Sequence, residues 1–476
     1  MALPLRQIVT ACALSFAPMG ANAQNLVTNG DFESINSGWT ISAGANFTTA
    51  MRAYPATSWL QAYSGNYYAN FGEVGASGSM SQTLTTVSGY KYVLSFYLYR
   101  ARESYNVNAG DFFTASAGGQ TLFSTSGLAY GLPYKNYSYS FQATSTSTLL
   151  EFAGQDNQDE YVLDTVSVVR ITPDATNSLT ALSWDRSNLR ALLSHRSAML
   201  SSMMDYDCAQ IRQNLCVTLQ ARSSGSSVSS DGAGVLVAAL ALRKDLRIGA
   251  FLDQPMGFTT PIRMSESATR PGAGVFAVAG QDDAPGWRAR VSFAARSGSL
   301  TLTRDASLSY NEAGSGAATL RERGFGAEVA HASRWGERLV SPFAGLNWIK
   351  AERGAYSEGS SVYYPLTYAA FGRISRSLRL GLRSEGQMGE DLRWRVSLGT
   401  ERELSGRLTA FSGTSDIPSL TSFSLAGEAL PNSWRPLASV GVDYRLQKNV
   451  ALTGSLSHRG GSNAMTSLMG GFRLDL

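Results

Sequence analysis

The chain has 476 residues, of which 43% are hydrophobic and only 16% are charged, with a formal net charge of +4. This length is enough for two or three domains, and so small a charge gives no basis for a nucleic-acid partner. Beyond the N-terminus no run of about 18 apolar residues occurs, so no transmembrane helix is expected, and a membrane protein of this composition would have to be a closed β-barrel.

Residues 1–23 have the pattern of a secretory signal peptide. Arg6 supplies a positive charge, Ile8 to Phe16 supplies a short apolar core, and Ala21-Asn22-Ala23 supplies a small-residue cleavage site. The mature chain is therefore expected to begin at Gln24. The alternative interpretation is a buried N-terminal strand or helix.

Residues 24–172 contain short alternating strands broken by Gly, Ser and Asn, which is typical of a β-sandwich. In the clearest strand, residues 92–99, successive side chains point to opposite faces, as they do in any β-strand. The expected inner set is Tyr92, Leu94, Phe96 and Leu98, and the expected outer set is Val93, Ser95, Tyr97 and Tyr99.

The opening Asn25-Leu-Val-Thr-Asn-Gly-Asp-Phe-Glu33, the following Gly38-Trp39 and the closing Leu163-Asp-Thr-Val-Ser-Val168 resemble a jelly-roll carbohydrate-binding module. The resemblance covers residues 25–171. It implies a jelly roll in which a structural calcium ion is held by Glu33 and Asp164, together with backbone carbonyls. The alternative is that Asp31 and Glu33 merely end a turn and that Asp164 forms hydrogen bonds with the backbone, so that no cofactor is present.

Sugar binding would need aromatic platforms, and the candidates for such a glycan site are Tyr97, Tyr99, Trp39 and Trp59. The alternative is that these rings pack over the sheet or under loops. An enzyme is not expected, because none of the three histidines lies before residue 172 and no cysteine follows the signal there, which excludes a Ser-His-Asp triad or a cysteine nucleophile in this part. The acidic residues near Asp156 are interpreted as a solvated or cation-binding loop.

Residues 173–212 are predicted to be a linker and a helix. Pro173 to Asn177 is expected to be a loop, and Ser187 to cap a helix that runs to about Met204. Leucines and methionines recur at helical spacing on one side of this segment. Behind it, Cys208 and Cys216 form an even pair in an exported chain, which indicates one disulfide; two free thiols are the alternative, and a metal site is not expected.

Residues 213–476 contain about twelve segments in which apolar and polar residues alternate, separated by turns, as in an outer-membrane barrel. At 392–399, for example, Leu392, Trp394, Val396 and Leu398 oppose Arg393, Arg395, Ser397 and Gly399. The polar side repeats Arg, Gly and Ser, which suits a hydrated lumen, whereas the apolar side suits lipid. The segments at 256–286 and 404–432 are the least regular.

A helix followed by such a barrel, behind a secreted β-domain, resembles the classical autotransporters. The resemblance implies a monomer whose barrel lies in the outer membrane lipid, inserted by the barrel-assembly machinery, and whose passenger domain is displayed at the cell surface. The helix would fill the lumen, where arginines would meet its C-terminus and Asp205, Asp207 or Glu328. No Asn-Asn pair occurs in 173–215, so the passenger is expected to stay attached. Glycan or surface adhesion is the expected role; a structural or protein-contact domain and a porin-like channel are the alternatives.

Overall fold

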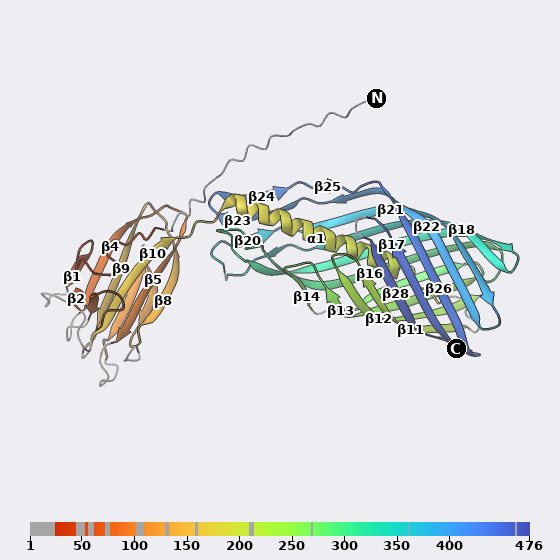
Figure 1. Cartoon of the computed structure of the whole chain (residues 1–476), viewed down its shortest axis with the longest axis horizontal. Coiled ribbons are helices and arrows are strands. Elements are labelled where there is room, and N and C mark those ends of the chain that lie inside the picture. Colours follow the sequence, from red (N-terminus) through yellow and green to blue (C-terminus); the bar gives the residue numbers. More distant parts are fainter. Residues whose placement is uncertain are drawn as a thin grey trace, which may run out of the picture. The chain divides into compact units, whose positions relative to one another are not determined.

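The computed structural model describes residues 24–43, 53–55, 61–71, 77–100, 109–128, 133–157, 160–208, 214–267, 270–360, 362–461 and 464–476. The expected signal peptide (1–23) and Trp59 lie outside these ranges. The chain divides into two compact units, one ending at Thr172 and one spanning Pro173–Leu476 (Figure 1). No helix in the described part is both long and apolar enough to span a membrane.

The first unit is a sandwich of two five-stranded antiparallel sheets. One has the order β1-β4-β9-β6-β7 and the other β2-β3-β10-β5-β8. The strands are β1 Thr40–Ala43, β2 Ala53–Pro55, β3 Tyr67–Phe71, β4 Gly78–Thr85, β5 Lys91–Arg100, β6 Phe112–Ala117, β7 Gln120–Thr125, β8 Lys135–Gln142, β9 Ser147–Gln155 and β10 Tyr161–Arg170.

Alternation along the strands decides what lies between the two sheets. The predicted inner face of β5 is confirmed, because Tyr92, Leu94, Phe96 and Leu98 are all buried in the core. Phe96 packs edge-on against Phe152 of the opposite sheet, with ring centroids 5.4 Å apart. The other face of the β5 sheet, which carries Tyr97, is therefore the one that remains outside the sandwich.

The second unit begins with a single helix, α1 (Ala175–Met203), inside a barrel. The barrel has 12 strands and is closed, since the first strand pairs with the last from Cys216↔Asp475 to Gly225↔Thr466. Its strands are β11 Leu215–Gly225, β12 Ser230–Arg243, β13 Leu246–Thr259, β15 Gly272–Ala279, β16 Gly286–Thr303, β17 Ser315–Trp335, β18 Arg338–Arg353, β21 Phe371–Met388, β22 Leu392–Leu408, β26 Trp434–Gln447, β27 Val450–Arg459 and β28 Met465–Asp475.

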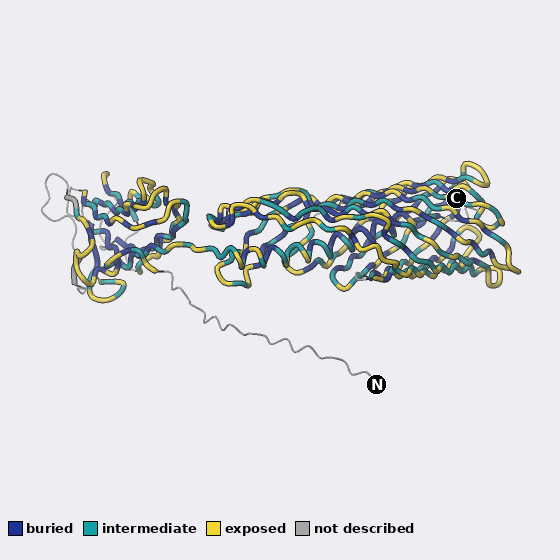
Figure 2. The backbone as a smooth tube through the Cα atoms, turned by 90° about the horizontal axis from the view of Figure 1, so that it is seen from above, coloured by how far each residue is buried: buried dark blue, intermediate teal, exposed yellow. Residues whose placement is uncertain are grey.

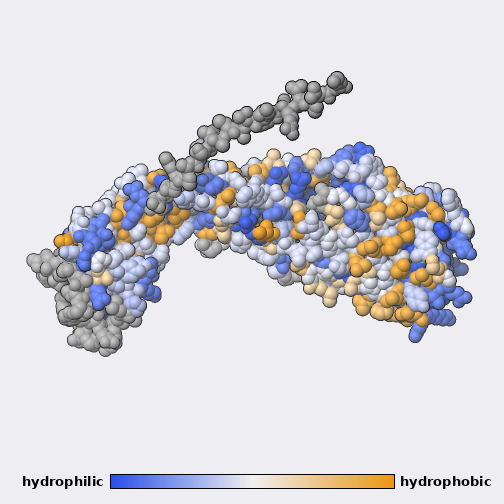
Figure 3. Space-filling view, in the orientation of Figure 1, coloured by the Kyte–Doolittle hydropathy of each residue, from blue (hydrophilic) through white to orange (hydrophobic). Residues whose placement is uncertain are grey.

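The predicted two-faced pattern of the barrel strands is confirmed. Leu398, Val442 and Phe472 are exposed on the outer wall, as the alternation requires for residues that face lipid. Buried and exposed positions alternate along the strands in Figure 2. Figure 3 shows apolar surface gathered on the barrel wall toward the end that holds the C-terminus.

The two irregular segments of the sequence are explained by long connections. Residues 264–267 form β14, which pairs with β16. Within 404–432 lie β23 (Phe411–Ile417), β24 (Leu420–Leu425) and β25 (Glu428–Ala429). The first two of these join β19 (Tyr356–Ser357) and β20 (Leu366–Tyr368) in a small separate sheet. These connections lie at the end opposite to the short turns, as expected for the extracellular end of an outer-membrane barrel.

Candidate functional sites: the plugged lumen and the tyrosine face

The helix starts earlier than predicted. Its N-cap is Asp174 rather than Ser187, because the Asp174 carboxylate accepts a hydrogen bond from the Asn177 amide at 2.8 Å. The expected loop at 173–177 is therefore the cap and first turn of the helix. The Asp174 amide also donates to the Tyr310 carbonyl on the connection between β16 and β17, so the barrel fixes where the helix begins.

The C-terminal third of the helix is enclosed on its polar side as well as on its apolar side. Arg196 is 1% exposed, bonds to Glu266 on β14 and lies 3.7 Å from Glu322 on β17. Its guanidinium and that of Arg296 each lie 5.3 Å from the centre of the Phe258 ring. A charged residue is buried here because its countercharges come from the barrel wall.

Arginines of the wall meet the C-terminal end of the helix, as the sequence predicted. Arg290 donates to the Met204 carbonyl at 2.9 Å, and Arg379 binds the Asp205 carboxylate at 2.8 Å. Arg379 and Arg383 both pair with Glu328. Positive charge at a helix C-terminus is favourable because the last carbonyls carry partial negative charge.

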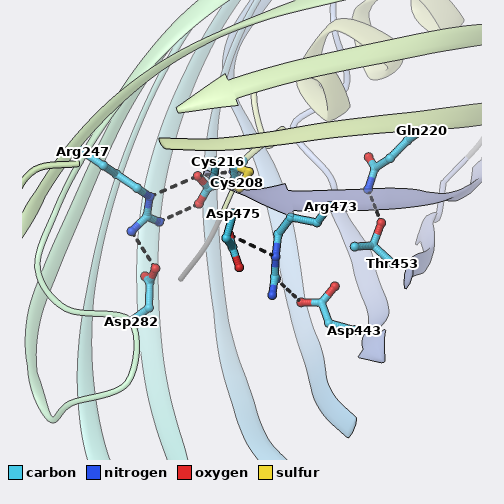
Figure 4. Close-up of a disulfide and its surroundings, with 10 residues drawn as sticks. Cys208, Cys216, Gln220, Arg247, Asp282, Asp443, Thr453, Arg473 and Asp475 are labelled. Carbon is cyan, nitrogen blue, oxygen red and sulfur yellow. Dashed lines mark hydrogen bonds and ion pairs between the residues drawn. A yellow bond between two sulfur atoms is a disulfide. The ribbon is translucent and has the colours of Figure 1, made fainter. Parts of the chain in front are cut away.

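The segment after the helix is tied to the start of the barrel. Cys208 and Cys216 form a disulfide with Cα atoms 6.1 Å apart. Next to it, Arg247 binds Asp207 at 2.7 Å and Asp282 at 2.6 Å, and Arg473 binds Asp443 (Figure 4). Residues of the strand that closes the barrel and of the segment that leaves the helix therefore line the same polar pocket.

The helix does not fill the whole lumen. It packs against β16, β17, β18 and β21. A cavity of about 350 Å³ remains toward the wall of β26, β27 and β28, lined by small residues such as Ser439, Ser455 and Ser457. The pore is thus plugged off-centre.

In the first unit, tyrosines gather on the outer face of the sheet that contains β5. Tyr63 stacks on Tyr97 with ring centroids 3.6 Å apart, and Tyr134 meets Tyr63 edge-on at 5.5 Å. A hydrogen bond between the two side chains raises the pKa of Tyr63 and lowers that of Tyr97. Tyr63 is 47% exposed, so nearly half of this residue is open to solvent.

The structure separates the predicted aromatic candidates. Tyr97 lies on the open face, beside Asn136 on the neighbouring strand β8. Tyr99 is buried beneath Tyr134, with ring centroids 4.4 Å apart, so it supports the face without reaching its surface. Trp39 lies in the sandwich core, 6.2 Å from the Phe152 ring, which leaves no platform for a ligand.

Tyr63 was not among the sequence candidates. Its position depends on Asp164, whose carboxylate accepts the amides of Tyr63 at 2.7 Å and Ser64 at 3.0 Å. Thr165, the next residue, has a φ of 51°, which is rare for a β-branched residue, and it marks a bulge in β10. This bulge turns Asp164 toward the segment that carries Tyr63.

The two predicted calcium ligands bind the two ends of that same segment. Glu33 accepts the amides of Asn66 and Tyr67 at 2.7 and 2.8 Å, and Asp164 accepts those of Tyr63 and Ser64. Within the described residues, no group of three or more His, Cys, Asp or Glu side chains could hold a metal ion. The calcium site stays a prediction. The backbone hydrogen bonds of Asp164 are those of the alternative interpretation, whereas Glu33 binds the backbone of a distant segment rather than ending a turn.

We expect the first unit to unfold at a lower temperature as the pH rises from about 4 to about 6. Burial raises the pKa of Asp164 to about 6. The hydrogen bonds that its carboxylate accepts from Ser64, Thr165 and Tyr63 lower the pKa, but by less than burial raises it. Unfolded aspartate titrates near about 3.9. Between these values the folded state binds more protons, so the free energy of unfolding decreases as the pH increases.

Thermal unfolding of the full chain, followed by tyrosine circular dichroism, measures this slope. Asp164→Asn should remove it, and Asp31→Asn, at an exposed carboxyl group, should not. If calcium binds Asp164, added calcium chloride would hold the carboxylate ionised and abolish the slope in the unchanged protein. A slope that persists in Asp164→Asn would assign it to another group.

The sequence did not single out the buried ion pair of this unit. Arg100 is 1% exposed and binds Asp156 at 2.7 Å and Asp111 at 3.2 Å. The interpretation of Asp156 as part of a solvated loop was wrong, because its carboxylate is fully buried. An arginine at the end of an otherwise apolar strand was the only signal available in the sequence.

A family model, the autotransporter β-domain, matches residues 217–457, which is just over half of the chain. No curated protein matches the sequence. Among solved structures, the chain is similar to the translocator domain of the autotransporter NalP from Neisseria meningitidis, with 14% identity over 64% of this chain and 100% of that one and a TM-score of 0.45.

The β-domain of the Bordetella autotransporter BrkA is similar at 13% identity, over 55% of this chain and 99% of that one, with a TM-score of 0.36. The chain is also similar to TmCBM61, solved in complex with β-1,4-galactotriose. The identity is 19%, over 31% of this chain and 99% of that one, and the TM-score is 0.25.

Proposed function

This chain belongs to the autotransporter family, and we propose that it displays its N-terminal sandwich as a glycan-binding module of the cell surface. Its barrel is embedded in the outer membrane and its passenger is exported to the surface. The proposal includes insertion by the barrel-assembly machinery, a monomeric state and a passenger that stays attached through α1.

The observation that supports glycan binding is the stack of Tyr63 on Tyr97. Sugars present a flat face of C–H groups, which packs well on an open aromatic ring whose polar end can form hydrogen bonds. Tyr63 offers such a ring, and the exposed Asn136 and Ser138 of β8 offer donors and acceptors beside it. The ring is held in place by Asp164, so little freedom is lost when a ligand binds.

We expect Tyr63→Ala to weaken glycan binding by at least about tenfold, because the platform would lose the ring that contacts the ligand. The measurement is binding of the fluorescently labelled full chain, in detergent micelles, to a glycan array. Tyr310→Ala, which removes an equally exposed tyrosine from a barrel connection, is the matched control and should bind as the unchanged protein does.

Tyr97→Ala should weaken binding as well, because Tyr63 would lose the ring on which it stacks. A folded full chain that binds no glycan on the array would contradict the glycan proposal. The autotransporter assignment would be unaffected, and a structural or protein-contact role of the passenger would then be favoured.

A further inference from the structure

The outer wall of the barrel has a hollow over β12, β13, β15 and β16. Its volume is about 660 Å³ and its lining is almost entirely apolar. Neighbouring outward positions carry alanine, with Ala238 opposite Ala250 and Ala277 opposite Ile248. The larger Leu240, Val275 and Phe293 border this strip and are 42–55% exposed. The hollow is therefore a consequence of the sequence, with small side chains between bulky ones.

The hollow lies in the periplasmic half of the wall. It includes Leu215, the first residue of β11, and Leu240, which pairs with it close to the short turn between β12 and β13. Leu246, just after that turn, pairs with Ala279 of β15, and Ala279 pairs with Ala289 of β16. Ala289 is two residues from Trp287, which therefore lies at the same end of the wall. Trp287 is 73% exposed, and tryptophans so placed mark the level of the lipid headgroups.

Basic residues lie at the same, periplasmic end of the wall. β12 ends at Arg243 and the turn continues with Lys244 and Asp245, all exposed. Arg243 lies 3.4 Å from the Asp245 carboxylate, in a solvent-exposed pair. From Leu240 to Arg243 the strand rises about 10 Å. An apolar tail in the hollow would thus place its headgroup beside two basic side chains, and basic groups at this depth attract lipid phosphates.

We propose that this hollow is a binding site for one glycerophospholipid of the periplasmic leaflet. An acyl chain lies on Ala238, Ala250 and Ala277, and the phosphodiester group contacts Arg243 and Lys244. Lipid is the occupant because this wall faces the bilayer, and the strip of alanines, together with the basic turn, distinguishes the site from the rest of the wall. The site would anchor the barrel at a fixed depth and is independent of the passenger's ligand.

The test is native mass spectrometry of the full chain in detergent, with added dioleoyl phosphatidylglycerol. We expect one lipid to be retained. Ala250→Phe and Ala277→Phe, which fill the hollow, should each weaken retention by at least about tenfold. Lys244→Gln should weaken it several-fold. Each variant is first checked for a folded barrel by its heat-dependent shift in electrophoresis.

Two matched controls are available on the opposite wall. Ala438→Phe makes the same change at an exposed outward position, and Lys448→Gln removes a lysine from another short turn. Both should retain lipid as the unchanged protein does. Equal retention by the hollow-filling variants and the controls would overturn the proposal. A second outcome would also overturn it: the unchanged protein forms a dimer, and Ala250→Phe loses the dimer but still retains lipid. The hollow would then be an interface between two copies of the chain.

Discussion

Replacing Arg196 by methionine is expected to loosen the plug helix and open the pore. The substitution removes the guanidinium that lies 3.7 Å from the buried Glu322, and it leaves the buried Glu266 with the more distant Arg296, at 3.9 Å. Breaking a buried pair by removing one partner costs about 3–5 kcal/mol. The ratio of docked to undocked helix should then fall by a factor on the order of 10²–10³. Planar-bilayer recordings of the full chain should show this as longer and larger openings.

The matched control is Arg190→Met, less than two turns earlier on the same helix. Arg190 binds Glu428 at 2.7 Å, but both side chains are a third or more exposed. Such a pair contributes less than about 1 kcal/mol, so the pore should stay closed. The double variant Arg196→Met with Glu266→Gln should restore part of the closure. Glutamine is neutral, so the double variant no longer buries a negative charge at position 266. Recordings of Arg196→Met that match the unchanged protein would contradict a role for this pair in holding the plug.

Replacing Arg100 by methionine is expected to unfold the displayed domain and leave the barrel intact. Asp111 and Asp156 would remain buried without their shared cation. The cost of about 3–5 kcal/mol is a large fraction of the stability of an ordinary domain, which is about 5–15 kcal/mol. Because the barrel is a separate compact unit, it should still assemble. Protease treatment of intact cells should then remove the passenger and spare the barrel.

Arg170→Met is the control for this experiment. Arg170 is exposed and its guanidinium lies 5.2 Å from the centre of the Tyr90 ring, a contact that contributes about 0.5–1 kcal/mol at such sites. The passenger of this variant should resist protease as the unchanged protein does. Equal resistance of Arg100→Met would show that the buried ion pair is dispensable for the fold.

The sequence by itself determined which faces of the strands are buried and which meet lipid. A period of two is a local property, so Leu398 and Arg395 fall on opposite sides of the barrel wall, and Phe96 and Tyr97 on opposite sides of a sheet, whatever their distant neighbours are. The apolar stripe of the helix, with Leu189, Leu192 and Met199, was equally readable, because helical spacing is also local.

The tertiary structure alone decided which distant residues meet. Asp174 caps the helix where a barrel connection holds it, and Ser187, with an equally suitable side chain, does not. Tyr63 stacks on Tyr97 because Asp164, about a hundred positions away, binds the backbone beside it. Trp39, a candidate for a ligand platform, and Asp156, a charged residue, are buried because Phe152 and Arg100 pack against them. Contacts between residues so far apart in the chain produce no periodic pattern in the sequence, because these residues meet only when the sheets have formed.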